Sequence, residues 1–214
     1  MVTYTEAMVT FIVGLFATSA ITYSMLGAAV TRIMVPIWTL SFLYPFAKRA
    51  VWFPQAVLGF TMAACVLPPW VALDKGQGNI RLPGYLFGAI FCWLIYLDLI
   101  YASQDRPDDE KAGVKSLAVW LGKDLKYFLT LLGLLQIVFL FKAAREAHAT
   151  AVLWVLGIGV WAMSIPWSIL SLNTADRGSG AHIFLANAVL SIYLSAVSAV
   201  DVWITSKRAA HVGF

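Results

Sequence analysis

Residues 83–102 read PGYLFGAIFCWLIYLDLIYA, a run of apolar and aromatic side chains interrupted by a single charged residue, Asp98. A helix needs roughly 20 predominantly apolar residues to cross the hydrocarbon layer of a bilayer. This run has that length and lacks the alternation of polar and apolar residues that marks a barrel strand. It therefore predicts a transmembrane helix, with one acid close to its end.

The same pattern recurs on both sides of this run. The whole chain is 61% hydrophobic and 12% charged, with a mean hydropathy of +0.80, whereas soluble domains carry about 25% charged residues. We expect an all-α membrane protein, a single-domain bundle of about seven transmembrane helices over residues 1–214, embedded in the lipid bilayer in an unspecified organelle. The net charge is +4 without a basic stripe, so no nucleic acid is expected as a partner. The predicted spans are 7–30, 33–46, 54–73, 83–102, 126–141, 150–172 and 181–206, of which the second and fifth are short.

Negative charge is concentrated in one segment, from Asp98 to Lys126. It holds six of the eleven acidic residues, namely Asp98, Asp105, Asp108, Asp109, Glu110 and Asp124. One structural explanation is a new helix that begins at Pro107, since proline suits the first turn and acids are favoured there by the helix dipole. That explanation leaves out Asp98, because an ionisable side chain in a membrane span costs about 2.5–3.5 kcal/mol at mid-depth and is a functional candidate.

The acids suggest a site for a metal and a phosphorylated ligand. Asp105 and Asp109 are four residues apart and are followed by Lys115. Mg²⁺ prefers oxygen ligands and is commonly held by one or two carboxylates together with substrate phosphates. Lys48 and Arg49 end the second span and fall on the same side if the spans alternate, although cations at a helix end also snorkel to the interface. A transporter or channel is a further alternative, because an intramembrane Asp is also a feature of ion paths, but no inverted repeat supports it.

Two longer stretches carry a family resemblance. Residues 96–122, YLDLIYASQDRPDDEKAGVKSLAVWLG, resemble the second Asp-rich motif of the UbiA family of membrane aromatic prenyltransferases. Residues 44–59, YPFAKRAVWFPQAVLG, are similar to that family's Tyr-x-x-x-Lys segment and the Pro-Gln that opens its next helix. The resemblance implies that Asp105, Asp108 and Asp109 bind Mg²⁺, with Asp98, Asp105 and Asp109 as catalytic residues. Residues implied to bind substrate are Tyr44, Lys48, Arg49 and Lys115.

The implied reaction transfers a polyprenyl group, farnesyl in the first instance, from an isoprenoid diphosphate to an aromatic acceptor. The wording of the motifs is most similar to fungal members that prenylate polyketide-derived aromatics in meroterpenoid biosynthesis, with a 4-hydroxybenzoate polyprenyltransferase of the ubiquinone pathway as the alternative. The family has nine helices and a first motif Asn-Asp-x-x-Asp. Here the chain resembles helices three to nine, and the acids before Asp98 are Glu6 and Asp74, outside that pattern. A non-catalytic truncated homologue is therefore a further alternative.

Overall fold

The computed structural model describes residues 3–50, 53–74, 77–113, 116–174 and 176–212, and these residues are helical apart from short links. No strand occurs among them, which confirms the all-α prediction. A 3₁₀ turn links α2 to α3, another links α5 to α6, and a seven-residue π-helix, Leu153–Gly159, precedes α7. The helices are α1 (Tyr4–Ala50), α2 (Pro54–Ala63), α3 (Leu67–Asp74), α4 (Arg81–Ala112), α5 (Leu117–Leu121), α6 (Leu125–Glu146), α7 (Val160–Ser171) and α8 (Arg177–Val212).

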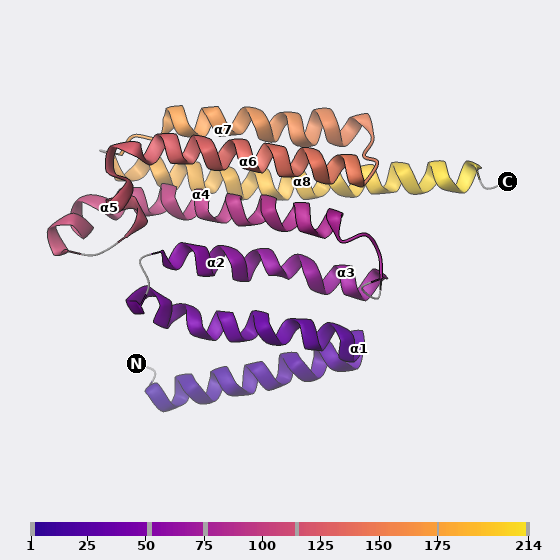
Figure 1. The fold of residues 1–214 in the computed structure, drawn as a ribbon, viewed down its shortest axis with the longest axis horizontal. Coiled ribbons are helices and arrows are strands. Elements are labelled where there is room, and N and C mark those ends of the chain that lie inside the picture. Colours follow the sequence, from indigo (N-terminus) through magenta and orange to yellow (C-terminus); the bar gives the residue numbers. More distant parts are fainter. Residues whose placement is uncertain (1–2, 51–52, 75–76, 114–115, 175, 213–214) are drawn as a thin grey trace.

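Six helical stretches among the described residues are long and apolar enough to cross a bilayer. The first, Tyr4–Tyr44, would measure about 60 Å if straight, which is twice the hydrocarbon thickness. It is not straight, because Gly27 has φ 83° and ψ 176°, a combination that is essentially restricted to glycine. The chain reverses there, and α1 forms two neighbouring arms (Figure 1). If the two arms of α1 are counted separately, the six stretches become seven apolar helical segments, the number predicted. The break between the first two lies at Gly27, however, and not between residues 30 and 33.

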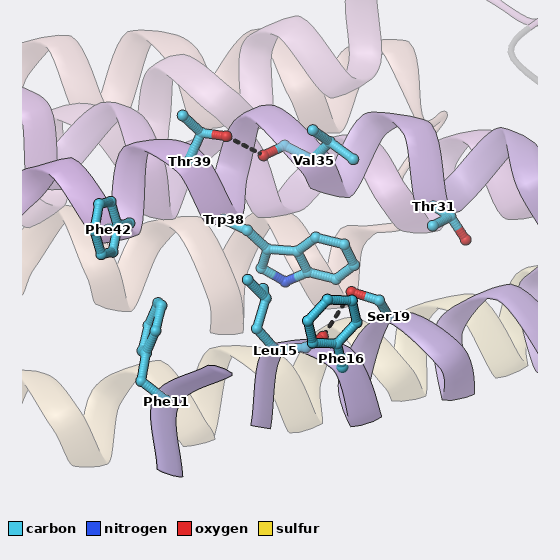
Figure 2. A pocket seen from close by; sticks show the side chains of 9 residues that line it. All are labelled: Phe11, Leu15, Phe16, Ser19, Thr31, Val35, Trp38, Thr39 and Phe42. Carbon is cyan, nitrogen blue, oxygen red and sulfur yellow. Dashed lines mark hydrogen bonds between the residues drawn. The ribbon is translucent and has the colours of Figure 1, made fainter. Parts of the chain in front are cut away.

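The two arms of α1 face each other through aromatic side chains (Figure 2). The ring centroids of Phe11 and Phe42 lie 5.5 Å apart, and Trp38 points from the second arm toward the first. A cavity of about 520 Å³ lies between the arms. Exposed apolar side chains such as Phe16 and Met25, 72% and 77% exposed, are what a helix in contact with lipid presents.

Helices α2 and α3 form one nearly continuous helical segment, interrupted by a 3₁₀ turn. Residues Ala64–Val66 adopt a 3₁₀ turn immediately before Pro68 and Pro69. A proline has no N–H to donate and its ring crowds the carbonyl four residues earlier. The prolines therefore disturb the turn that precedes them.

Helix α4 lies at the centre and packs against α2, α6 and α8. Most of its buried residues belong to the main core, together with buried residues of α5, α6 and α8. Members exposed by 2% or less include Tyr96, Leu99, Ile100, Leu125, Leu129 and Ile183. The core thus fixes α4, the helix that carries most of the acids.

Three connections meet at one end of the bundle (Figure 1). There α1, α4 and α7 finish and α2, α5 and α8 begin, and we call it the acidic end. Ring contact between Phe53, before α2, and Trp120 of α5 at 5.7 Å joins two of the connections. The third connection ends beside them, because Gly180 in the first turn of α8 lies against the side chain of Gln104 in α4. Alternating spans therefore place the end of α1 on the side of the acids, as predicted.

Candidate functional site

The acids of the site lie on the last turns of α4. Asp105 and Asp109 are one helical turn apart, with Asp105 exposed and Asp109 half-buried, and Asp108 beside them is exposed. The helix runs without a break through Pro107 to Gly113, whose φ of 68° ends it. The alternative of a new helix beginning at Pro107 is therefore wrong. Asp108 and Asp109 lie in or next to the last turn of α4, where the dipole disfavours negative charge by a few tenths to about 1 kcal/mol each, so a bound cation would stabilise them.

Arg106 makes two contacts on either side of Pro107. Its Nε donates to Glu110 Oε1 at 2.7 Å, an ion pair that spans the turn containing the proline. Its Nη1 donates to the carbonyl of Gly122 at 2.9 Å, which ties the end of α4 to the turn after α5. The guanidinium is thus a structural clamp, and its described contacts are to protein groups.

The following helix is fixed by the serine of the Gly-Val-Lys-Ser segment. Ser116 Oγ accepts a hydrogen bond from Val119 N at 3.3 Å and caps α5. Leu117 and Ala118 are then buried against the core. Lys115, predicted to bind substrate, lies outside the described residues.

Asp98 lies seven residues before Asp105, about two turns or 10 Å deeper along the same side of α4. It is half-buried between Leu97 and Leu99, which are 7% and 0% exposed. Asp98 makes a polar interaction and is not a free carboxylate. The structure therefore places this acid inside the bundle on the side that leads to the acidic end.

The last turns of α1 bring the other predicted residues to this end. Tyr44 is half-buried and is also engaged in an interaction. Lys48 and Arg49 belong to the helical backbone of α1, but their side chains lie outside the described residues. The structure thus brings the α1 terminus and the α4 acids to one end, and it describes no contact between these cations and the acids.

Two buried amides at this end were missed by the sequence analysis. Gln55, in the first turn of α2, is 9% exposed, and its Oε1 has no hydrogen-bond partner in the part of the chain described. Gln104, directly before Asp105, has a buried Nε2 that is also unpartnered there. Both residues lie within the two stretches that carry the family resemblance. In the sequence, each of these glutamines is a polar residue at the edge of an apolar helical run, and that position could have marked it as a candidate.

The third connection has a structural role in the described residues. Asp176 Oδ1 accepts from Gly178 N at 2.9 Å, as a residue capping the start of α8 would. The side chain of Arg177 lies outside the described residues.

The acidic end supplies carboxylate ligands suited to a divalent cation, but not a complete set of protein ligands in the described residues. In the described part of the chain, no three His, Cys, Asp or Glu side chains are grouped to hold a metal. Asp105 and Asp109 nevertheless supply two carboxylates at a spacing of about 5–6 Å between Cβ atoms. Mg²⁺ needs no more protein ligands than that when phosphate oxygens complete its shell.

Comparison with known proteins decides the family. Residues 1–194 match the UbiA prenyltransferase family. The chain belongs to this family. Membership, together with the six long apolar helices, makes it an integral, multi-pass membrane protein, and UbiA prenyltransferases generally depend on a divalent metal.

Individual UbiA relatives extend the match. The chain is 68% identical over 207 residues to the polyprenyl transferase ntnF of Nectria sp, covering 97% of this chain and 67% of that protein. It is 64% identical over 203 residues to the polyprenyl transferase atnF of Arthrinium sp, covering 94% and 65%. A mitochondrial 4-hydroxybenzoate polyprenyltransferase of Arabidopsis thaliana is 40% identical over 146 residues, covering 66% and 34%. The chain thus spans about two thirds of the length of the first two relatives. No solved structure matches it.

Proposed function

We propose that this protein transfers a polyprenyl group from its diphosphate to an aromatic acceptor at the acidic end. The observation that carries the proposal is the pair Asp105 and Asp109, one helical turn apart near the end of α4, at the end of the bundle where α1 also finishes. Two carboxylates one helical turn apart are suited to a divalent cation that also binds phosphate oxygens. The names of the Nectria and Arthrinium relatives support the same activity.

In this proposal Asp105 and Asp109 hold Mg²⁺, with Asp108 next to them. When bound, the metal supplies positive charge that stabilises the diphosphate as it leaves. Lys48, Arg49 and Lys115 bind the same diphosphate through their cations, as the family resemblance implies. Stabilising charge at the leaving group is the main catalytic requirement, since such electrostatic stabilisation is commonly the largest single contribution.

The reaction breaks the bond between C1 of the prenyl group and the diphosphate oxygen and forms a bond from C1 to a ring carbon. The ring then loses the proton from that carbon. In this proposal Asp98, about two turns deeper on α4, orients the acceptor or takes up this proton. The apolar side chains around it exclude water, which would otherwise capture the allylic cation.

For the finer specificity we propose a farnesyl donor and an aromatic acceptor of fungal secondary metabolism, in the manner of meroterpenoid biosynthesis. The two relatives above 60% identity cover at least 94% of this chain and come from Nectria and Arthrinium. The alternative acceptor is 4-hydroxybenzoate, because the Arabidopsis relative bears that name. Its match covers 66% of the chain, so we place it second.

The test is transfer by membranes that carry the chain. They are incubated with Mg²⁺, radiolabelled farnesyl diphosphate and either 4-hydroxybenzoate or a polyketide-derived phenol such as orsellinic acid. The expected result is a labelled lipophilic product that requires the metal and forms with the polyketide-type phenol. Product with 4-hydroxybenzoate alone would reverse the order of the two acceptors.

A matched arm addresses the alternative of a non-catalytic homologue. The same assay is run with the chain fused to the part of the Nectria relative that lies outside the 207 matched residues. Activity in either form supports the proposal. Folded protein without product in both forms, with every acceptor, would overturn it.

A further inference from the structure

A second cavity lies toward the end of the bundle opposite the acidic end. It measures about 540 Å³, a size typical of small-molecule sites. The lining is mostly apolar, with Leu86 of α4, Leu140 of α6 and Leu194 of α8 among the residues that form it. Leu86 lies about 28 Å along α4 from Asp105, so the cavity is separate from the proposed catalytic site.

Asp201 is the charged residue in the described lining of this cavity. It lies within the apolar stretch Gly178–Arg208 of α8 and is 6% exposed. An acid inside a membrane span is costly, and such acids commonly pair with a cation or face a polar path. In the described part of the chain, no Lys, Arg or His forms an ion pair with Asp201. Its negative charge is therefore not balanced by a described cation of this protein.

The two oxygens of this carboxylate have different surroundings. Oδ1 accepts from Thr150 N at 3.0 Å, from Leu153 N at 3.4 Å and from the Thr150 hydroxyl, and so caps the helical segment that starts there. Oδ2 accepts no hydrogen bond from the described residues, and it is not one of the side-chain atoms sealed inside the protein without a partner. The capping role thus uses one oxygen and leaves the other accessible, on a residue that lines the cavity.

The other polar side chains of the described lining are hydroxyls that have no hydrogen to spare. Ser198, Thr205 and Ser206 each donate to a backbone carbonyl of the preceding turn of α8, at 2.8–2.9 Å. A hydroxyl carries one hydrogen and can still accept through its oxygen. The side chains of this cavity therefore offer a carboxylate and hydroxyl oxygens as acceptors, and the complementary ligand is a donor with positive charge.

We propose that this cavity binds a primary ammonium group carried on an apolar chain, with the ammonium at Asp201 Oδ2. An ammonium has three N–H donors and no acceptor, which matches a lining that supplies acceptors, and its charge balances the buried carboxylate. The apolar chain covers the leucines of α4, α6 and α8. The inference does not depend on the proposed prenyl transfer. Loss of transfer activity would leave it intact, and the reverse also holds.

The test compares ligands that share a chain and differ in the head group. Purified full chain in phosphatidylcholine nanodiscs is titrated with tritiated octylamine, and uptake by empty nanodiscs is subtracted. We expect saturable binding of one octylamine per chain. Unlabelled octanol, which lacks the charge, should displace it at least about tenfold more weakly than unlabelled octylamine does, as loss of a charged hydrogen bond would give. Octyltrimethylammonium, which keeps the charge without N–H donors, should also be weaker. Equal displacement by octanol, or no saturable binding, would overturn the proposal.

Variants assign the preference to Asp201. Asp201→Asn keeps an oxygen that can cap the helix but removes the charge, so octylamine affinity should fall at least about tenfold, to that of octanol. Glu146→Gln is the matched control, because Glu146 is an acid of the same end that lies outside the lining and is bonded to Asn79. It should behave as the unaltered protein. Unchanged affinity in Asp201→Asn, or an equal loss in Glu146→Gln, would overturn the assignment. If Asp201→Asn does not fold, Ala147→Leu decides, because this exposed lining position narrows the cavity without touching the charge and should weaken octylamine binding.

A primary ammonium can come from a lipid headgroup or from a free amine. Phosphatidylethanolamine carries this group, whereas the headgroup of phosphatidylcholine has no N–H, so the titration is repeated in nanodiscs that contain both lipids. We expect competition, seen as a severalfold weaker apparent octylamine affinity, because Val202 in the lining is 68% exposed and leaves the cavity open at the side. Competition that is absent in Asp201→Asn would assign the site to the lipid. Octylamine affinity that is equal in the two membranes would assign it to a free amine, and either result supports an ammonium site.

Discussion

Asp105 carries the sharpest prediction at the scale of single residues. Asp105→Asn keeps the shape of the side chain and removes its charge, so the metal loses one of two anionic ligands. We expect prenyl transfer to fall by about 100-fold or more, with part of the loss recovered at higher Mg²⁺ concentration. The measurement is the rate of labelled product formation across an Mg²⁺ titration, and Asp109→Asn should behave in the same way.

The control for this pair is an acid of the same segment that lies off α4. Asp124 is exposed in the turn before α6, and Asp124→Asn makes the same chemical change in the same surface region. It should retain the rate and the Mg²⁺ dependence of the unaltered protein. A similar loss in all three variants would mean that general surface charge, and not the α4 pair, supports the reaction.

Residue types at the acidic end were predictable, but their surroundings were not. Asp105 and Asp109 could be paired from their spacing of one helical turn. Gln104 could not be recognised, because its burial depends on Gly180 of α8, 76 positions later, whose missing side chain leaves room for the amide. Gln55 is similar, since only the packing of α2 against α4 shows that its oxygen is buried.

Contacts between elements give a stability prediction. An ideal Cβ at Gly133 of α6 would lie 2.4 Å from Ile165 Cγ2 of α7, and a β-branched buried side chain has little freedom to move. Gly133→Ala should therefore cost about 1–3 kcal/mol through overpacking, despite the better helix propensity of alanine. Thermal unfolding in detergent should show a lower midpoint.

Gly14→Ala is the matched variant, because nothing lies within 4 Å of the added Cβ. Its midpoint should stay the same or rise slightly. A Gly133→Ala midpoint equal to that of Gly14→Ala would show that α6 and α7 are not packed as closely as described.

Element boundaries were predicted less well than element existence, and α6 shows why. The apolar run ended at residue 141 because Lys142 follows, yet the helix continues to Glu146. Lys142 lays its ammonium 5.6 Å from the centre of the Tyr85 ring, while Ala143 and Ala144 beyond it are 4% exposed. A charged residue with a long apolar stem can therefore stay inside a helix, and hydropathy alone places the helix end too early.

At the scale of the whole molecule, the reversal of α1 fixes the count of crossings. The apolar runs predicted two spans in the first fifty residues, but composition could not locate the turn because Gly27 is flanked by apolar residues. Its backbone conformation, which needs glycine, marks the position. With this reversal, α1, α4 and α7 end on one side of the bilayer, and the proposed diphosphate site is built from connections of that side alone.

The reversal also makes the topology testable by labelling. In a background with Cys65 and Cys92 replaced by alanine, single cysteines are placed at Thr3 and Lys123 for the acidic side and at Met25 and Gln77 for the opposite side. In sealed vesicles of known orientation, a membrane-impermeant maleimide should label one pair, and the other pair only after permeabilisation. A straight α1 would place Met25 in the middle of the membrane or reverse the orientation of every later helix. Labelling of positions 25 and 123 from the same side would therefore contradict the fold. It would also contradict the proposal that Asp105, Asp109 and the end of α1 act on one side of the bilayer.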